Sequence, residues 1–243
     1  MKRIRNRMGA LSFRRPAFFA MLMLFSAVIA ISTAGPVYAK KKKVKYKYTV
    51  TLAHAKNDEK GRSSSNSVGA KPGDQTKREV SMDSLGYYGG WSWVARPKSS
   101  KAAKIIAQQA IAGCKNNKIG YGKGEPSLAT EAELVKYNLK KIDKKVNTDC
   151  FMFVHTCCAA AGIEASPIHL DDPAQAEEEK ALYAEWGEEP PQRSYDVFTI
   201  LKDKAHRNRI KPENLKVGDI LVKMKKKSRH AAIVCKIKKK KIR

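Results

Sequence analysis

The residues best suited to chemistry are a cysteine that follows an aspartate and a histidine far along the chain. Cys150 stands in the stretch NTDCFMFVHTCC, and the apolar residues and alanines after it predict a helix that stops at Gly162. Asn147, Thr148 or Asp149 can cap this helix. Cys150 then lies in the first turn, where unpaired backbone N–H groups and the helix dipole favour a thiolate. The pattern therefore predicts a pKa below the usual ~8.5, a nucleophilic sulfur, and N–H groups that can bind an oxyanion.

A thiol nucleophile needs a base, which we expect to be a histidine from another part of the fold. His155 lies on the same predicted helix and points away from Cys150, because each helical residue turns the chain by about 100°. His230 opens an apolar strand, AAIV, directly after a turn. This position holds an imidazole firmly and exposes one ring nitrogen, so His230 is the preferred base. The remaining candidates are His54, His169 and His206.

Other uses of the cysteines stay open from the residues alone. Five cysteines in an exported chain can form two disulfides and leave one thiol. Zinc needs several correctly spaced ligands, and no CxxC pair is present, so we expect no metal. The glycine-rich stretch IGYGKGEPS lacks the lysine and hydroxyl spacing of a phosphate loop. The sequence therefore predicts no nucleotide and no other cofactor.

The pattern of apolar residues places helices before strands. It predicts helices over residues 99–116, 131–142 and the segment that starts at Cys150, and strands over 48–55, 216–224 and 230–238. The acidic insert at about 171–189 holds eight acidic residues and one lysine, and resembles an inserted helix that balances nearby lysines. Helices followed by antiparallel strands are typical of an α+β domain.

Residues 1–39 have the features of an export signal. A basic start precedes the apolar run AFFAMLMLFSAVIAIS, and small residues at Val37-x-Ala39 mark a cleavage site. The alternative is an uncleaved anchor, since the run nears the ~20 residues of a membrane span. Cleavage is the preferred reading, and it leaves no stable membrane span. A basic arm at 40–50 and a domain at 51–243 then remain.

The mature chain is strongly basic. Removing six basic signal residues lowers the formal charge from +26 to +20. Such a chain binds polyanions without specificity. The lysines form short clusters and match no nucleic-acid-binding motif, so we expect no specific nucleic acid. For an exported protein the expected partners are anionic cell-wall polymers, and the expected location is extracellular and associated with the wall.

Two stretches together resemble the NlpC-like cysteine peptidase superfamily, which includes the CHAP amidases. They are TDCFMFVHTCCAAAGI and LKVGDILVKMKKKSRHAAIVCKI, which carry an Asp-Cys pair, a Gly-Asp strand entry and a strand-opening His. IGYG resembles the family's glycine-tyrosine element, and the segment from Gly73 to Thr76 is similar to one in phage-type and secreted peptidoglycan amidohydrolases. The resemblance covers roughly residues 50–238.

The resemblance implies a papain-like domain whose cysteine helix packs on a C-terminal antiparallel sheet. It implies hydrolysis of amide bonds in peptidoglycan stem peptides, without metal or cofactor. Cys150 would attack the carbonyl, and His230 would hold the thiolate as an ion pair and protonate the leaving amine. Tyr121 and Asp149 are the candidates for contacts to the substrate or the oxyanion.

The chain departs from the family pattern in two places. Phe151 stands where a small residue usually follows the cysteine, and no polar group other than lysine and arginine follows His230 to orient its ring. The orienting group either comes from elsewhere, as an acid in the earlier half or a backbone carbonyl, or is missing. The alternative function is therefore a catalytically weak or inactive member that binds the cell wall or its glycans through its positive charge.

Overall fold

The computed structural model describes residues 44–87, 90–123, 125–171, 173–202, 210–225 and 228–242. The export signal at 1–39, residues 40–43 of the basic arm, and His206 lie outside these residues. The α-helices are α1 Ser100–Lys115, α2 Leu128–Leu134, α3 Cys150–Ala159, α4 Pro173–Trp186 and α5 Ser194–Val197. The strands are β1 Tyr46–Ala55, β2 Val80–Ser84, β3 Trp93–Pro97, β4 Ile119–Tyr121, β5 Val146–Thr148, β6 Phe198–Lys202, β7 Ile220–Lys225 and β8 Ser228–Lys241.

Six of these strands form one antiparallel sheet in the order β2-β1-β8-β7-β3-β6. Half of them precede the cysteine helix in the chain, so the expected division into early helices and a C-terminal sheet is wrong. The α+β class is confirmed. The error arose because β2 and β3 are only five residues long, so their short apolar patterns did not stand out as strands.

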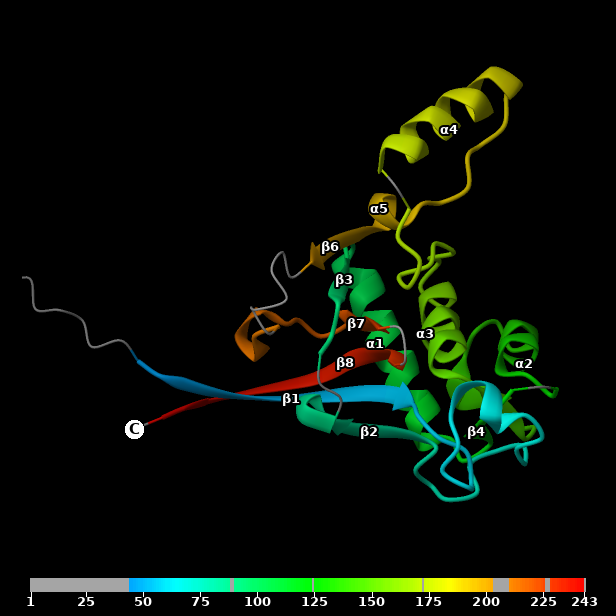
Figure 1. Ribbon diagram of the computed structural model, residues 1–243, viewed down its shortest axis with the longest axis vertical. Helices are drawn as coiled ribbons and strands as arrows, with labels where there is room; N and C mark the ends of the chain where they lie inside the picture. The colour runs from blue at the N-terminus through cyan, green and yellow to red at the C-terminus, as the bar shows by residue number, and fades with distance from the viewer. Residues whose placement is uncertain are drawn as a thin grey trace, which may run out of the picture. The chain divides into compact units, whose positions relative to one another are not determined.

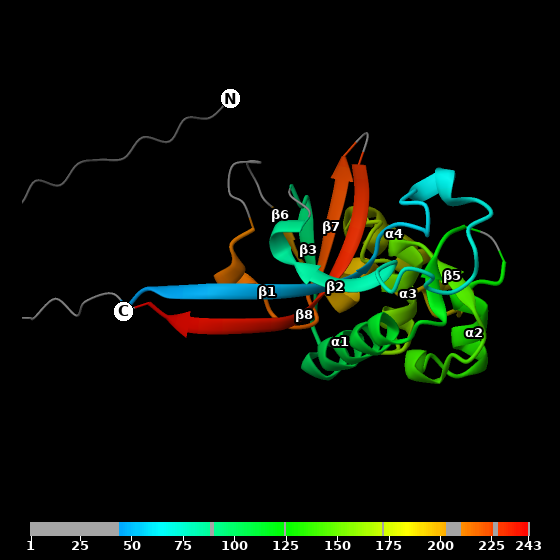
Figure 2. The same ribbon diagram turned by 90° about the horizontal axis from the view of Figure 1, so that it is seen from below.

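Helices α1 and α3 pack on one face of this sheet, as the two views in Figures 1 and 2 show. The larger core lies between these helices and the alternate residues of β1 and β8 that point toward them. A smaller cluster covers the opposite face and includes Leu52, Leu221, Ala232 and Val234, with Trp91 packed against it. The sheet is thus buried on both faces where β1, β8 and β7 run side by side.

The helices next to the cysteine form for the predicted reasons, with one exception. Ser99 caps α1 by accepting a hydrogen bond from the N–H of Ala102, as its predicted position requires. The expected helix over 131–142 is wrong, because α2 ends at Leu134 and a 3₁₀ turn follows at Leu139–Lys141. Between them the backbone has positive φ values of 54° and 56° at Lys136 and Tyr137. These angles interrupt a helix, although the apolar spacing continues across them.

A short parallel pair of strands, β4 and β5, leads the chain into the cysteine helix. The segment IGYG was expected to be a loop, but Ile119–Tyr121 is a buried strand. The loop from Gly73 to Thr76 packs on it, and a Cβ added at Gly120 would lie 2.3 Å from the Gly73 carbonyl oxygen. Glycine is therefore required at 120 by close backbone contact.

The predicted Gly-Asp entry to β7 has a structural role. Gly218 has φ +89°, and a Cβ there would lie 2.4 Å from the Ala103 carbonyl oxygen of α1. Asp219 is buried and accepts hydrogen bonds from the Arg96 guanidinium at 2.8 and 2.7 Å. This bidentate pair joins β3 to the start of β7 and thereby fixes the hairpin that carries His230.

The acidic insert contains the helix α4, as expected from its composition. Figure 1 shows this helix standing apart from the sheet, beside α5. Lys180 on α4 contacts Asp196 on α5 at 3.1 Å, and Arg193 contacts Glu179. These pairs join the helix to the chain that follows it. In the described part of the chain, no helix has the length and apolar character needed to cross a membrane.

Candidate active site

Cys150 occupies the first turn of α3, as the sequence predicted. Asp149 is the N-cap, and its Oδ1 accepts hydrogen bonds from the N–H groups of Phe151 and Met152 at 2.8 and 2.7 Å. The backbone N–H groups of Cys150 and Phe151 also point toward the sulfur, and so does the N–H of Ala231 on β8. The helix start therefore surrounds the sulfur with N–H donors, which is the arrangement expected from the dipole argument.

The expected lowering of the Cys150 pKa is wrong. Burial raises the pKa of this thiol to about 12, and the three N–H groups offset only part of this effect. The Asp149 carboxylate raises the pKa further. Desolvation disfavours a charged sulfur more than the helix start favours it, because Cys150 is only 9% exposed. The resting group at this site is a neutral thiol.

The contact with Ala231 places the sulfur beside the residue that follows His230. The paired residues of β1 and β8 end at Ala53 and Ile233, whereas β7 stays paired with β8 past Ala231. The sulfur therefore meets β8 where β1 has separated from it. Adjacent strand residues point to opposite faces, so the His230 ring projects from the face opposite Ala231. Approach of the Cys150 sulfur to the His230 ring therefore stays a prediction.

His230 is the first buried residue of β8, and it begins a chain of buried hydrogen bonds. Its Nε2 lies 2.9 Å from Nδ1 of His54 on β1, although 176 residues separate the two in sequence. His54 Nε2 lies 2.9 Å from Oδ2 of Asp83 on β2. The same carboxylate accepts hydrogen bonds from Lys56 at 2.8 Å and from Ser81 at 2.9 Å. Three neighbouring strands thus supply the group that the sequence left unassigned.

The order of donors in this chain follows from the carboxylate. An ionised Asp83 can only accept, so His54 Nε2 carries the proton and His54 Nδ1 accepts from His230 Nε2–H. The other nitrogen of His230, Nδ1, is then the basic one. Hydrogen bonds from Lys56, Ser81 and His54 outweigh burial and lower the pKa of Asp83, which keeps it ionised. The partners therefore fix the tautomers of both rings.

Both imidazoles are neutral near pH 7. Burial, together with the charges of His54 and Lys223, lowers the pKa of His230 to about 3. Burial also lowers the pKa of His54, against the opposing effect of Asp83. Trp91 lies 6.0 Å from the His230 ring and Tyr87 lies 5.6 Å from the His54 ring. These aromatic rings shield the histidine pair from water, which favours the neutral forms.

The remaining predicted residues have varied surroundings. Tyr121 pairs with Thr148 across β4 and β5, two residues before Cys150, but its side chain is only 2% exposed and packs in the larger core. The capping contacts give Asp149 a structural role. Contact of either residue with a substrate stays a prediction. His155 is exposed on α3, as expected, and His169 is exposed in a loop.

All five cysteines are free thiols in the structure, so the alternative of two disulfides, which the sequence left open, is not realised there. Cys157 and Cys158 are fully buried, and burial raises their pKa values well above the ordinary range. In the described segments of the chain, no cluster of His, Cys, Asp and Glu could hold a metal ion.

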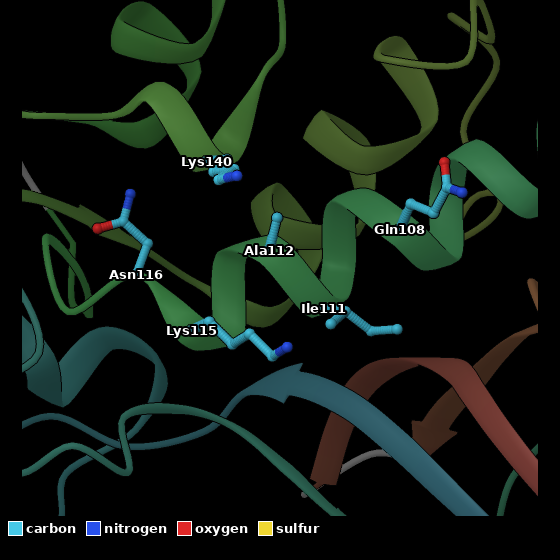
Figure 3. Close-up of a pocket in the computed structure, with 6 residues that line it drawn as sticks. All are labelled: Gln108, Ile111, Ala112, Lys115, Asn116 and Lys140. Atoms are coloured by element: carbon cyan, nitrogen blue, oxygen red, sulfur yellow. The ribbon is translucent and has the colours of Figure 1, made fainter.

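A hollow of about 450 Å³ beside α1 contains none of the predicted site residues. Figure 3 shows its lining side chains along α1 and at Lys140. This hollow is lined by neither a nucleophile nor a base, so we do not assign the reaction to it. The candidate site remains the end of the sheet where Cys150 meets β8.

His54 and Asp83 are the site residues that sequence reasoning did not assign. The available signal was His54 itself, which lies between Ala53 and Ala55 near the end of the predicted strand, where a buried imidazole needs a partner. The reasoning sought the orienting group after His230 in the chain. The structure supplies it from the N-terminal strand, because β1 lies next to β8.

Comparison with known protein families gives a match that includes all of the candidate site residues. A family model described as an endolysin-like domain matches residues 52–241, which is more than half of the chain. The chain belongs to the endolysin-like domain family. Membership in this family indicates a protein that acts on the cell wall, with peptidoglycan as its substrate. Searches of curated proteins and of solved structures each found no match.

The match includes Cys150 and every residue of the hydrogen-bond chain from His230 through His54 to Asp83. The endolysin-like domain family thus supports the part of the resemblance that concerned peptidoglycan hydrolysis. It does not specify the NlpC or CHAP superfamily, the papain-like fold or the type of bond that is cut.

Proposed function

We propose that this endolysin-like protein is a cysteine hydrolase that cleaves amide bonds in peptidoglycan stem peptides. The observation that carries the proposal is the chain of hydrogen bonds from His230 through His54 to Asp83. A buried nucleophile, a base and two orienting groups in sequence are the parts that thiol hydrolases need. The contact between the Cys150 sulfur and the N–H of Ala231 supports the assignment of Cys150 as the nucleophile.

The first step joins the sulfur to the substrate. The Cys150 sulfur attacks the amide carbonyl carbon while its proton passes to Nδ1 of His230, and the carbonyl electron pair moves to oxygen. The N–H of Cys150 is placed to donate to this oxyanion. When the intermediate collapses, the carbon–nitrogen bond breaks and the leaving amine takes the proton from His230. The product of this step is a thioester on Cys150 and a free amine.

The second step restores the thiol. Water attacks the thioester carbonyl and gives a proton to His230, and the carbon–sulfur bond then breaks. The Cys150 sulfur recovers a proton and a new carboxylic acid leaves. In both steps His54 and Asp83 act through His230, since they hold its Nε2 as the donor and its Nδ1 as the base. They are positioning residues and do not touch the substrate.

The pKa values favour proton transfer during attack over a stable ion pair at rest. A thiol with its pKa near 12 and an imidazole with its pKa near 3 are both neutral at pH 7. The earlier expectation of a resting thiolate–imidazolium pair is therefore replaced by general-base catalysis. The charge pair forms only as the substrate reacts, when the Asp83 carboxylate can stabilise the imidazolium through His54.

A second candidate is a weakly active or inactive protein that binds the wall. The burial of Cys150 and its raised pKa favour this alternative, because a neutral, poorly accessible thiol is a weak nucleophile. The continuous hydrogen bonds from His230 to Asp83 favour the enzyme. A protein that only binds has no need to align two buried imidazoles with a carboxylate, each costly to desolvate. Export of the chain by residues 1–39 and an extracellular, wall-associated location belong to both proposals.

Mass analysis of the soluble products from purified peptidoglycan tests the proposal. Cleavage of stem peptides gives fragments with new amino groups and new carboxylates, and leaves the number of reducing sugar ends unchanged. The mass of the fragments identifies which amide bond was cut. Products that carry only new reducing ends would show a glycosidase and would contradict the proposal. No fragments at all would favour the binding protein.

A further inference from the structure

The strands that carry the two histidines continue beyond the site as a two-stranded ribbon. We call residues 45–51 and 236–241 the basic ribbon. β2 pairs with β1 only from Thr51 to Ala55, and β7 pairs with β8 only from Ser228 to Ile233. Apart from Thr51, which pairs with Ser84, the described strands leave the ribbon unpaired on both outer edges. Figures 1 and 2 both show it projecting away from the helices and the rest of the sheet.

One face of the basic ribbon carries only lysine and threonine. The register places Lys47 opposite Lys240, Thr49 opposite Lys238, and Thr51 opposite Lys236. Directly opposed residues share a face, so four lysines project together. Alternate residues of a strand are about 6.7 Å apart, so the three lysines of β8 form a row with that spacing. We call these four lysines the lysine row.

The opposite face of the ribbon combines aromatic and apolar residues with two lysines. Tyr46, Tyr48, Val50 and Ile237 lie there, together with Lys239 and Lys241. The Nζ of Lys239 is 4.0 Å from the centre of the Tyr46 ring and 5.7 Å from that of Tyr48. The charge of Lys239 is thus used within the ribbon by cation–π contact. Among the cation–π contacts of the described residues, none involves the lysine row.

The lysine row has no acidic partner within the described part of the chain. None of the ion pairs among the described residues involves a ribbon lysine, and all four side chains are exposed. Like charges directly opposite each other destabilise a strand pair, as at Lys47 and Lys240. Lysines on free strand edges also prevent aggregation, and this role is compatible with binding an anion. The remaining positive charge is available to an external anion.

We infer that the lysine row binds a linear cell-wall polymer whose charges are recurring phosphodiester groups. A row of cations at regular spacing fits a chain of anions better than it fits a single compact anion. Lysine binds phosphate as a point charge and without strict geometry, which suits a flexible polymer. The choice of a wall polymer rests on the proposed function, since the ribbon shares strands with the candidate active site.

The ribbon would hold the protein on the wall while the site at the other end of the same strands reaches stem peptides. Binding through counterion release depends strongly on salt, and each lysine contact adds to the slope of log affinity against log salt. The ribbon also lies outside the buried hydrogen-bond chain. Binding and cleavage should therefore be separable by substitution.

Binding of the full chain to purified poly(glycerol phosphate), measured at several salt concentrations, tests the inference. The test variant carries Gln at Lys47, Lys236, Lys238 and Lys240. The control variant carries Gln at four exposed lysines elsewhere, Lys101, Lys104, Lys118 and Lys141. The two have the same net charge. The test variant should bind about tenfold to 100-fold more weakly, with a salt slope reduced by about 3, and the control should change by less than about threefold.

Equal loss of affinity in both variants would overturn the inference, since net charge alone would then explain binding. Preferred binding to a single-stranded oligonucleotide, or to vesicles that contain phosphatidylglycerol, would overturn the choice of partner. A variant with Arg at the four positions should bind like the parent, and circular dichroism checks that each variant is folded. Loss of peptidoglycan cleavage in Cys150→Ala with binding intact, or the reverse in the ribbon variant, keeps the failure of one proposal distinct from that of the other.

Discussion

The two ends of the β1–β8 strand pair use polar residues in opposite ways. At one end His54 and His230 are almost fully buried, and hydrogen bonds join them to each other and to Asp83. At the other end the lysine row is exposed and has no acidic partner in the described residues. The same two strands thus carry a neutral, shielded pair and an open row of charge. The difference shows that burial and hydrogen-bond partners determine whether a polar residue on these strands is neutral or charged. Its position in a strand does not determine this.

The largest loss of kcat is expected when a histidine at the buried end of the strand pair is replaced. Replacing His230 with Ala removes the base that the proposed mechanism requires, so kcat on stem-peptide substrates should fall by at least about 1,000-fold. Amino groups released from peptidoglycan measure the rate. His155→Ala is the matched control, since His155 is exposed on the cysteine helix and should change kcat by less than about twofold. A His230 variant as active as the parent would remove His230 from the mechanism.

A smaller loss of kcat is expected when only the direction of the hydrogen bonds between Asp83, His54 and His230 is reversed. Asp83→Asn offers an N–H to His54, which can reverse both imidazoles and leave His230 Nδ1 protonated. We expect kcat to fall about 100-fold with little change in KM, because the substrate does not touch Asp83. Ser81→Ala is the control, since it removes a hydrogen bond to the same carboxylate and leaves the order intact. Equal losses in kcat from both variants would indicate a merely structural carboxylate.

The buried end should also make stability depend on pH. The pKa of His230 is about 3 in the folded chain and 6.5 when the ring is exposed, so between these values only the unfolded state binds the proton. Stability is therefore lost as the pH falls from 6.5 toward 3, and the lowered pKa of His54 acts in the same direction. The urea midpoint should be lower at pH 5 than at pH 7, with a smaller decrease in His230→Gln. A midpoint that rises toward pH 5 would contradict neutral buried imidazoles.

The smallest effect is expected at the open end. Gln at the four positions of the lysine row should change kcat on a small soluble stem peptide by less than about twofold, because no hydrogen bond or ion pair among the described residues joins these lysines to His230, His54 or Asp83. The same variant should release fragments from whole walls more slowly, through weaker binding. A large loss on the small substrate would show that the ribbon contributes to the chemistry, and the contrast between the two ends would fail.

Local features of the site could be predicted from the sequence, whereas long-range ones could not. The cap at Asp149, the helix start at Cys150 and the strand at His230 follow from neighbouring residues. The partnership of His54 with His230 depends on which strands lie side by side, and 176 residues separate the two. Strand order is set by the packing of the whole sheet, so no local pattern shows it.

The pKa of Cys150 was mispredicted for a related reason. The helix dipole and the capping N–H groups are local and could be read from the sequence, but the depth of burial depends on β8 and its neighbours. The family match and the resemblance agree on the cell wall as the place of action, and the sulfur's surroundings decide how the proton must move.

The most direct test of the central claim compares amide cleavage by the parent chain with that by Cys150→Ala on purified peptidoglycan. If the Cys150 sulfur forms the thioester, new amino termini should appear with the parent and at least about 1,000-fold more slowly with the variant. If the variant releases amino termini as fast as the parent, another group performs the reaction, and the assignment of Cys150, His230, His54 and Asp83 is wrong.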